Sequence, residues 1–211
     1  MMSNTSLSEV LSKYIPAPAV PICTSWIVKL NIHLRITKSR ASKYGDYRPA
    51  RGTDAHLITV NHNLNPYAFL ITFIHEVAHL ACEKKHSRFA APHGREWKNE
   101  YSALLNFFLS KSVFPPDIEK ALRQYVKDPA ASSCTDENLL RTLKAYDRNE
   151  NEKVTFLEEL PHGSLFRLNA SGKLFRKGGL MRKRFQCIEV TSGTEYRVSA
   201  LAEVTTEGSG E

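Results

Sequence analysis

The residues with the clearest chemical meaning are His75, Glu76 and His79, which belong to the five-residue sequence His-Glu-Val-Ala-His. Residues four apart on a helix face the same side, so both imidazoles could bind one metal ion. The glutamate between them could take a proton from a water molecule at that ion. This spacing predicts a zinc hydrolase, with a peptidase as the favoured class. The alternative is a helix on which two histidines pack or face solvent.

A catalytic zinc site usually has three protein ligands, so a third ligand is expected elsewhere in the chain. His93 is the preferred candidate. The segment 83–92 would let the chain turn back toward the helix, and Gly94 would let the backbone approach the metal. The expected cofactor is therefore one zinc ion held by His75, His79 and His93, with Glu76 as the general base.

Two carboxylates are rival third ligands, because Glu96 and Glu100 lie one turn apart on the next expected helix. They could equally cap that helix, orient a histidine or face water. His86 is expected at the surface, near the end of the motif helix. Arg95 and Tyr101 are close to the motif in sequence, but nothing in the spacing directs either of them toward a substrate oxygen.

The helix that carries the motif is expected to be buried on most sides. Asn65 is a good N-cap, Pro66 suits the first helical position, and residues 67–74 are mostly apolar all round. The preceding segment, 55–61, is rich in β-branched and apolar residues and predicts a strand. An edge strand beside the motif helix could bind an extended peptide by strand addition.

The remaining pattern predicts an α+β protein. The expected helices are 7–15, 25–29, 96–109, 117–126 and 136–146, and a further strand is expected at 33–37. Short alternating segments then predict a small antiparallel β module, with strands at 154–157, 164–168, 173–175, 184–190 and 196–198. The fold expected is a helical domain with a small sheet and a buried motif helix, followed by this module.

Four motifs resemble the SprT-like domain family, which includes the Spartan-type proteases that act on DNA–protein crosslinks. They are Tyr44-Gly45-Asp46-Tyr47-Arg48, Ile58–Asn61 with Leu64, Phe69–His79, and His93-Gly94-Arg95-Glu96-Trp97. The resemblance implies a zincin-like metallopeptidase domain over residues 1–115, with a protein substrate and a link to DNA. A helical connector (116–152), a basic β module (153–205) and a disordered tail (206–211) would follow.

Many members of this family carry a four-cysteine zinc ribbon after the protease domain. Here the cysteines are Cys23, Cys82, Cys134 and Cys187, and no two of them form a Cys-x-x-Cys pair. A second, structural zinc is therefore not expected. Unpaired cysteines, together with the lack of a signal sequence or a long apolar span, favour a cytoplasmic protein that is not bound to a membrane.

The net charge of +7 is unevenly distributed. Between residues 161 and 190, seven cations oppose one acid, and a second basic stretch covers residues 29–51. Such clusters attract phosphate backbones, so DNA is a possible partner. The candidate contacts are Arg176, Lys177, Arg182, Lys183 and Arg184, with Phe175 and Phe185 available for base stacking if exposed. The alternative is an ordinary solvated face over a phenylalanine core.

Overall fold

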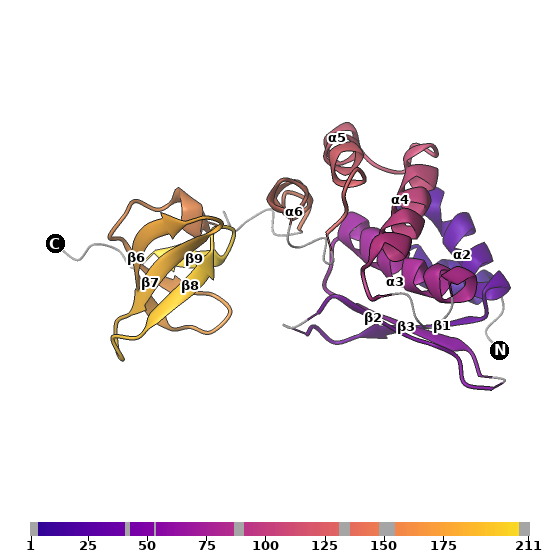
Figure 1. Ribbon diagram of the computed structural model, residues 1–211, viewed down its shortest axis with the longest axis horizontal. Coiled ribbons are helices and arrows are strands. Elements are labelled where there is room, and N and C mark those ends of the chain that lie inside the picture. Colours follow the sequence, from indigo (N-terminus) through magenta and orange to yellow (C-terminus); the bar gives the residue numbers. More distant parts are fainter. Residues whose placement is uncertain are drawn as a thin grey trace. The chain divides into compact units, whose positions relative to one another are not determined.

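The computed structural model describes residues 4–40, 43–52, 54–86, 91–130, 136–147 and 155–206. The chain divides into two compact units, Met1–Arg148 and Asn149–Glu211, each with its own sheet and hydrophobic core (Figure 1). The first unit combines helices with a three-stranded sheet, and the second is mostly β. The expected α+β class is confirmed.

The first unit contains helices before, between and after its strands. In chain order its elements are α1 (Asn4–Leu11), the 3-10 helix η1 (Ala17–Ala19), α2 (Val20–Lys29), β1 (Ile32–Thr37), β2 (Gly45–Arg48), β3 (His56–Asn61), α3 (Pro66–His86), α4 (Arg95–Leu109), α5 (Pro116–Tyr125) and α6 (Glu137–Lys144). The first two predicted helices differ most from the structure at their ends. The first closes in a turn after Leu11, and the second begins at Val20 because its early Pro21 needs no backbone hydrogen bond.

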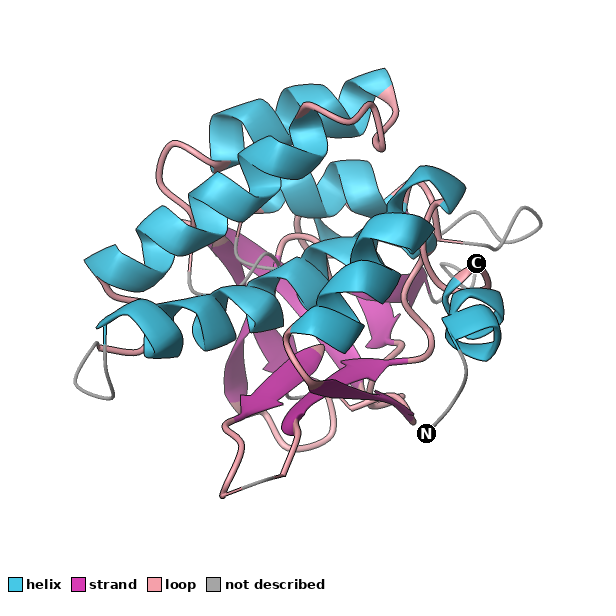
Figure 2. Ribbon diagram, turned by 90° about the vertical axis from the view of Figure 1, so that its right-hand side faces the viewer, coloured by secondary structure: helices cyan, strands magenta, loops and turns pink. Residues whose placement is uncertain are grey.

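The sheet of the first unit has the strand order β1-β3-β2. β3 pairs in parallel with β1 and antiparallel with β2, so β3 is the central strand and both of its sides are occupied. β3 is the strand expected at 55–61. The expectation that it is an edge strand beside the motif helix is wrong, because the short strand β2 pairs along one of its sides and β1 along the other. Helices α2, α3 and α4 lie on one face of this sheet (Figures 1 and 2).

Helix α3 carries the motif and is buried as predicted. The Asn65 side chain caps it by accepting hydrogen bonds from the backbone N–H groups of Tyr67 and Ala68 at 3.1 and 2.9 Å. Residues 69–74 are all buried, and so are most of the residues through Cys82. Burial on nearly all sides holds the helix in place, which fixes the positions of any side chains that it presents to a site.

Helices α5 and α6 belong to the first unit. Their buried residues Ile118, Leu122, Leu139 and Leu143 are members of the same core as those of α3 and α4. The segment 116–147, expected from sequence as a connector, therefore contributes to the packing of the domain that precedes it. Residues 148–154, where the expected connector ends and the β module begins, lie outside the described residues.

The second unit is a six-stranded sheet with the order β4-β9-β5-β6-β7-β8, in which all described pairings are antiparallel. Its elements are β4 (Thr155–Phe156), the 3-10 helix η3 (Leu157–Glu159), β5 (Leu165–Leu168), β6 (Leu174–Met181), β7 (Arg184–Glu189), β8 (Glu195–Ser199) and β9 (Glu203–Thr206). The expected antiparallel module is confirmed. Thr206, expected as the start of a disordered tail, is instead the last residue of β9 and pairs with Phe166 of β5. The rest of that tail lies outside the described residues.

Neither unit contains, among its described residues, a helix that is long and apolar enough to cross a membrane. The described cysteines Cys23, Cys82 and Cys187 are free and buried, as expected for small apolar side chains. Cys134 lies outside the described residues.

Candidate metal centre

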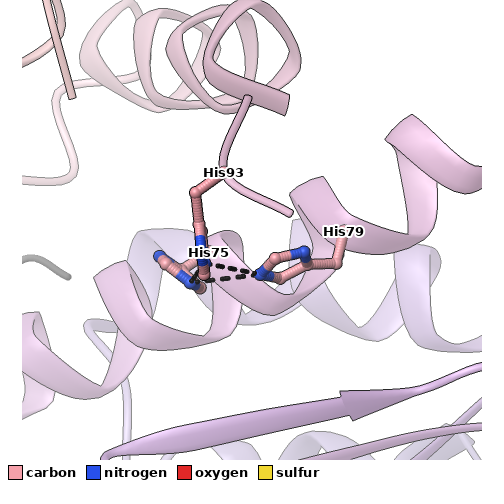
Figure 3. A group of neighbouring side chains, drawn as sticks. All are labelled: His75, His79 and His93. Atoms are coloured by element: carbon pink, nitrogen blue, oxygen red, sulfur yellow. Dashed lines mark hydrogen bonds between the residues drawn. The ribbon is translucent and has the colours of Figure 1, made fainter. Parts of the chain in front are cut away.

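The structure brings together the three histidines that the sequence selected. His75 and His79 project from one side of α3, and His93 reaches them from the turn before α4 (Figure 3). The three Nε2 atoms form a small triangle. The distances are 3.3 Å from His79 to His75, 3.1 Å from His79 to His93 and 3.2 Å from His93 to His75.

This triangle cannot be satisfied by hydrogen bonds alone. Each Nε2 of a neutral imidazole is either a donor or an acceptor, and three mutually adjacent atoms cannot all alternate between the two roles. At least one pair must therefore place two lone pairs, or two N–H groups, against each other. A cation that accepts all three lone pairs removes this conflict, so the group could hold a metal ion.

Burial keeps these imidazoles neutral. Desolvation, followed by repulsion from the other two histidines, lowers the pKa of His75 to about 3. Desolvation and then repulsion from His93 lower the pKa of His79 to about 4, and desolvation also lowers the pKa of His93. Neutral imidazole is the form that binds a metal, so the site is ready for a cation without first losing protons at neutral pH.

His93 adopts a backbone conformation that residues other than glycine rarely adopt. Its φ angle is +59°, and the N–H of Gly94 donates to the carbonyl of Ala91 at 2.9 Å, which closes a turn with Pro92 and His93 at its centre. Proline followed by a residue with positive φ is the pattern of a type II turn, where glycine or asparagine is usual. The backbone freedom expected of Gly94 is therefore needed at His93, and Gly94 is the extended N-cap of α4.

Aromatic rings hold the three histidines from two sides. The fully buried ring of Trp97 lies 4.7, 5.3 and 4.6 Å from the rings of His75, His79 and His93. On the sheet side, Tyr47 of β2 stacks parallel to His79 at 6.3 Å, and its hydroxyl donates to Glu83 Oε2 at 2.8 Å. These contacts restrict the rotation of each imidazole.

Glu76 is buried beside the histidines on the adjoining face of α3, and its side chain is only 6% exposed. Desolvation, with a smaller contribution from the negative charge of Asp46, raises the pKa of Glu76 to about 8. Lys43 and Arg40 oppose this rise. A carboxyl group with a pKa near neutrality can both accept and release a proton under physiological conditions.

The rival ligands do not join the histidine group. Glu100 forms an ion pair with Lys85 at 2.7 Å and lies 3.5 Å from His86 Nε2, and His86 is exposed as predicted. Glu96 lies in the first turn of α4, where a negative charge is favourable. Of the two residues considered near the reacting oxygen, Arg95 is exposed, whereas Tyr101 is fully buried with its ring 5.3 Å from that of His75.

The candidate nucleic-acid residues separate into exposed and buried groups. Arg176, Arg182, Lys183 and Arg184 are exposed on β6, β7 and the turn between them. Lys177 is only 4% exposed, and its ammonium donates to the carbonyls of Glu158 and Leu160 while lying 3.9 Å from the Phe185 ring centroid. The prediction that Lys177 contacts nucleic acid is therefore wrong, because its ammonium donates hydrogen bonds to buried carbonyls inside the second unit.

The phenylalanines of this module are also not available for base stacking. Phe175 is 2% exposed and stacks with Phe166 in the core, and Phe185 packs against the same core. The exposed apolar side chains nearest to the basic turn are Leu180 and Met181. The core interpretation of the phenylalanines, weighed from sequence as the alternative, is the one that the structure bears out.

Three residues of the site have roles that the residue types alone do not reveal. Trp97 was noted only as the last residue of a family-like motif, although it packs against all three histidines. Tyr47 and Gly45 were noted only for their place in a family-like motif. The strand that carries them, β2, is four residues long and mostly polar, so it has no alternation of apolar and polar residues that would predict a strand.

Comparisons of the chain with protein-family models, with curated proteins and with solved structures found no match. The function of this chain is therefore inferred from the geometry and chemistry of its side chains.

Proposed function

We propose that this protein is a zinc-dependent endopeptidase of the SprT-like type, with a zincin-like first unit. The observation that carries the proposal is the spacing of the three imidazole nitrogens. In a tetrahedral site with Zn–N bonds of about 2.05 Å, two ligand nitrogens lie about 3.3 Å apart. The Nε2 distances of 3.1, 3.2 and 3.3 Å agree with this value, so the residues present fit zinc.

His75, His79 and His93 would hold the ion as three neutral ligands. When bound, zinc would supply Lewis-acid chemistry, which polarises a peptide carbonyl and makes a water molecule more acidic. Glu76 would accept the proton of that water and transfer it to the leaving amine. The position of Glu76 supports this role, because it is buried and directly follows the candidate ligand His75 on the same helix.

The first sheet offers a place for an extended polypeptide. β2 is an edge strand, and along its outer side no other described strand pairs with it. β2 also contacts α3 through Gly45 and Glu76. A peptide that paired with this edge would lie beside Glu76, which favours a protein substrate over a small molecule.

A second candidate function is a nucleic-acid-associated module whose zinc is structural or whose catalysis is vestigial. The exposed cations Arg176, Arg182, Lys183 and Arg184 favour a nucleic-acid partner, and they would also suit a peptidase that acts on DNA-bound proteins. Glu76 favours the peptidase, because a structural zinc site has no use for a buried carboxylate next to its ligands.

The two candidates are separated by a cleavage assay on purified protein. We expect one zinc per chain, and cleavage of an unfolded protein substrate or of the chain itself that stops on chelation and in the Glu76→Gln variant. Single-stranded DNA should increase cleavage if nucleic acid recruits the substrate. Zinc binding without cleavage, with or without DNA, would reject the peptidase in favour of the second candidate.

A further inference from the structure

Gly45, the first residue of β2, lies against the side chain of Glu76. A Cβ atom added at Gly45 would lie about 2.4 Å from Glu76 Oε1 and 2.9 Å from Glu76 Cγ. It would also lie 2.8 Å from Thr72 Cγ2. Contacts this short do not occur for real side chains, so the carboxylate occupies the space that any other residue at position 45 would fill.

The backbone on the Gly45 side of this contact is held in place. Gly45 pairs with Val60 of the central strand, and the N–H of Asn61 donates to the carbonyl of Tyr44 at 2.9 Å. The Asn61 side chain donates in turn to the carbonyls of Arg40 and Lys43, at 3.2 and 3.0 Å. These bonds anchor the residues before Gly45, and the pairing of Asp46 with Thr59 anchors the residue after it, so β2 cannot easily withdraw from α3.

The α3 side of the contact is equally constrained. Thr72 and Glu76 lie one turn apart on a buried helix, and Thr72 Oγ1 donates to the carbonyl of Ala68 at 2.8 Å. The helix itself is packed between the sheet and the neighbouring helices and cannot shift as a unit without disturbing the core. The Glu76 side chain is therefore the part that must move if position 45 acquires a side chain.

We propose that Gly45 is a positioning residue that acts through Glu76: its lack of a side chain makes the space in which the Glu76 carboxylate is held for proton transfer. This inference rests on the proposed function, because it assigns Gly45 a part in the same reaction. Glycine is required here for space and not for backbone conformation, since Gly45 does not have the positive φ angle of Gly52 or Gly163.

The first test is kinetic. Gly45→Ala should keep one zinc per chain, because none of the three histidines touches Gly45 in this contact. Its kcat should fall by about 100-fold with little change in KM, as expected when a reacting group is misplaced by about 1 Å. The matched control is Gly179→Ala, since a Cβ at Gly179 meets nothing within 4 Å and this residue lies in the second unit. Wild-type kcat in Gly45→Ala would overturn the proposal.

The second test does not depend on activity. Gly45→Ala and Glu76→Ala are made singly and together, with Thr72→Ser in all four chains to remove the Thr72 methyl contact, and unfolding is followed in denaturant. Gly45→Ala should lower the unfolding midpoint when Glu76 is present and leave it nearly unchanged when Glu76 is replaced by alanine. An equal decrease in both backgrounds would overturn the proposal.

The two tests separate the possible failures. If the wild-type protein cleaves nothing but the midpoints still show the dependence on Glu76, the peptidase assignment fails while the steric relation between Gly45 and Glu76 stands. If the wild-type protein is active and the midpoints are independent of Glu76, the peptidase assignment stands and the role of Gly45 fails.

Discussion

Replacing Glu76 by glutamine should make the metal-free protein more stable at neutral pH. Glutamine has the same shape as glutamate, so the close approach to Gly45 is unchanged. It carries no charge, whereas the wild-type carboxyl is ionised in the unfolded chain at neutral pH and is kept protonated by burial in the folded chain. A side chain that is kept for chemistry would thus reduce the stability of the empty site.

The size and sign of this effect follow from the pKa of Glu76, which burial raises from 4.5 to about 8. Between these two values the unfolded chain has lost the proton that the folded chain retains. The free energy of unfolding therefore falls as pH rises, by about 1.4 kcal/mol per pH unit. From pH 5 to pH 7 the wild-type protein should lose about 3 kcal/mol relative to Glu76→Gln, and the loss should level off above pH 8.

The assay is denaturant unfolding of chelated wild-type protein and of Glu76→Gln at several pH values. Tryptophan fluorescence reports the first unit alone, because both tryptophans, Trp26 and Trp97, lie within it. The titrations of His75 and His79 are common to both proteins and cancel in the difference. A difference that does not grow between pH 5 and pH 7 would mean that the carboxyl ionises as readily in the folded chain as in the unfolded one, and that burial does not raise its pKa.

Three other changes have defined outcomes. His93→Asn keeps a residue that tolerates positive φ but removes the imidazole. Zinc affinity, measured by chelator competition, should therefore fall by more than about 100-fold. Full affinity in this variant would assign the third ligand to a carboxylate of α4. Lys177→Met leaves buried carbonyls without a donor and should lower the unfolding free energy of the second unit by about 1 to 3 kcal/mol in a circular-dichroism melt, while exposed Lys183→Ser should not. Replacing Arg182, Lys183 and Arg184 together by serine should weaken single-stranded DNA binding and reduce the slope of log affinity against log salt by about 2, and an unchanged slope would reject this surface.

Much of the candidate site could be predicted because its chemistry is local. The spacing of His75 and His79 is a property of any helix, and the cap at Asn65 and the apolar residues after it specify that helix strongly. His93 could be preferred as third ligand from its place after the segment 83–92, with Glu96 and Glu100 as rivals. Its positive φ angle could not be predicted, because proline followed by histidine is not a common signal for such a turn.

The parts that sequence did not reveal depend on contacts between distant segments. Gly45 and Glu76 are far apart in the chain, and their contact follows from the pairing of β2 with β3. The order of the first sheet also comes from this pairing, which is why an edge position beside the motif helix belongs to β2. Lysine is usually a surface residue, so the sequence gives no sign that Lys177 is buried. Only the fold of the second unit shows that its ammonium donates hydrogen bonds to buried carbonyls.

Metal analysis of the purified protein tests whether the three imidazoles converge on one zinc ion. Wild-type protein and a variant in which His75, His79 and His93 are all replaced by asparagine would be compared after dialysis against zinc-free buffer. We expect one zinc per chain in the wild type and none in the variant. A wild type that holds no zinc, or a variant that holds as much as the wild type, would show that these three histidines do not form a zinc site.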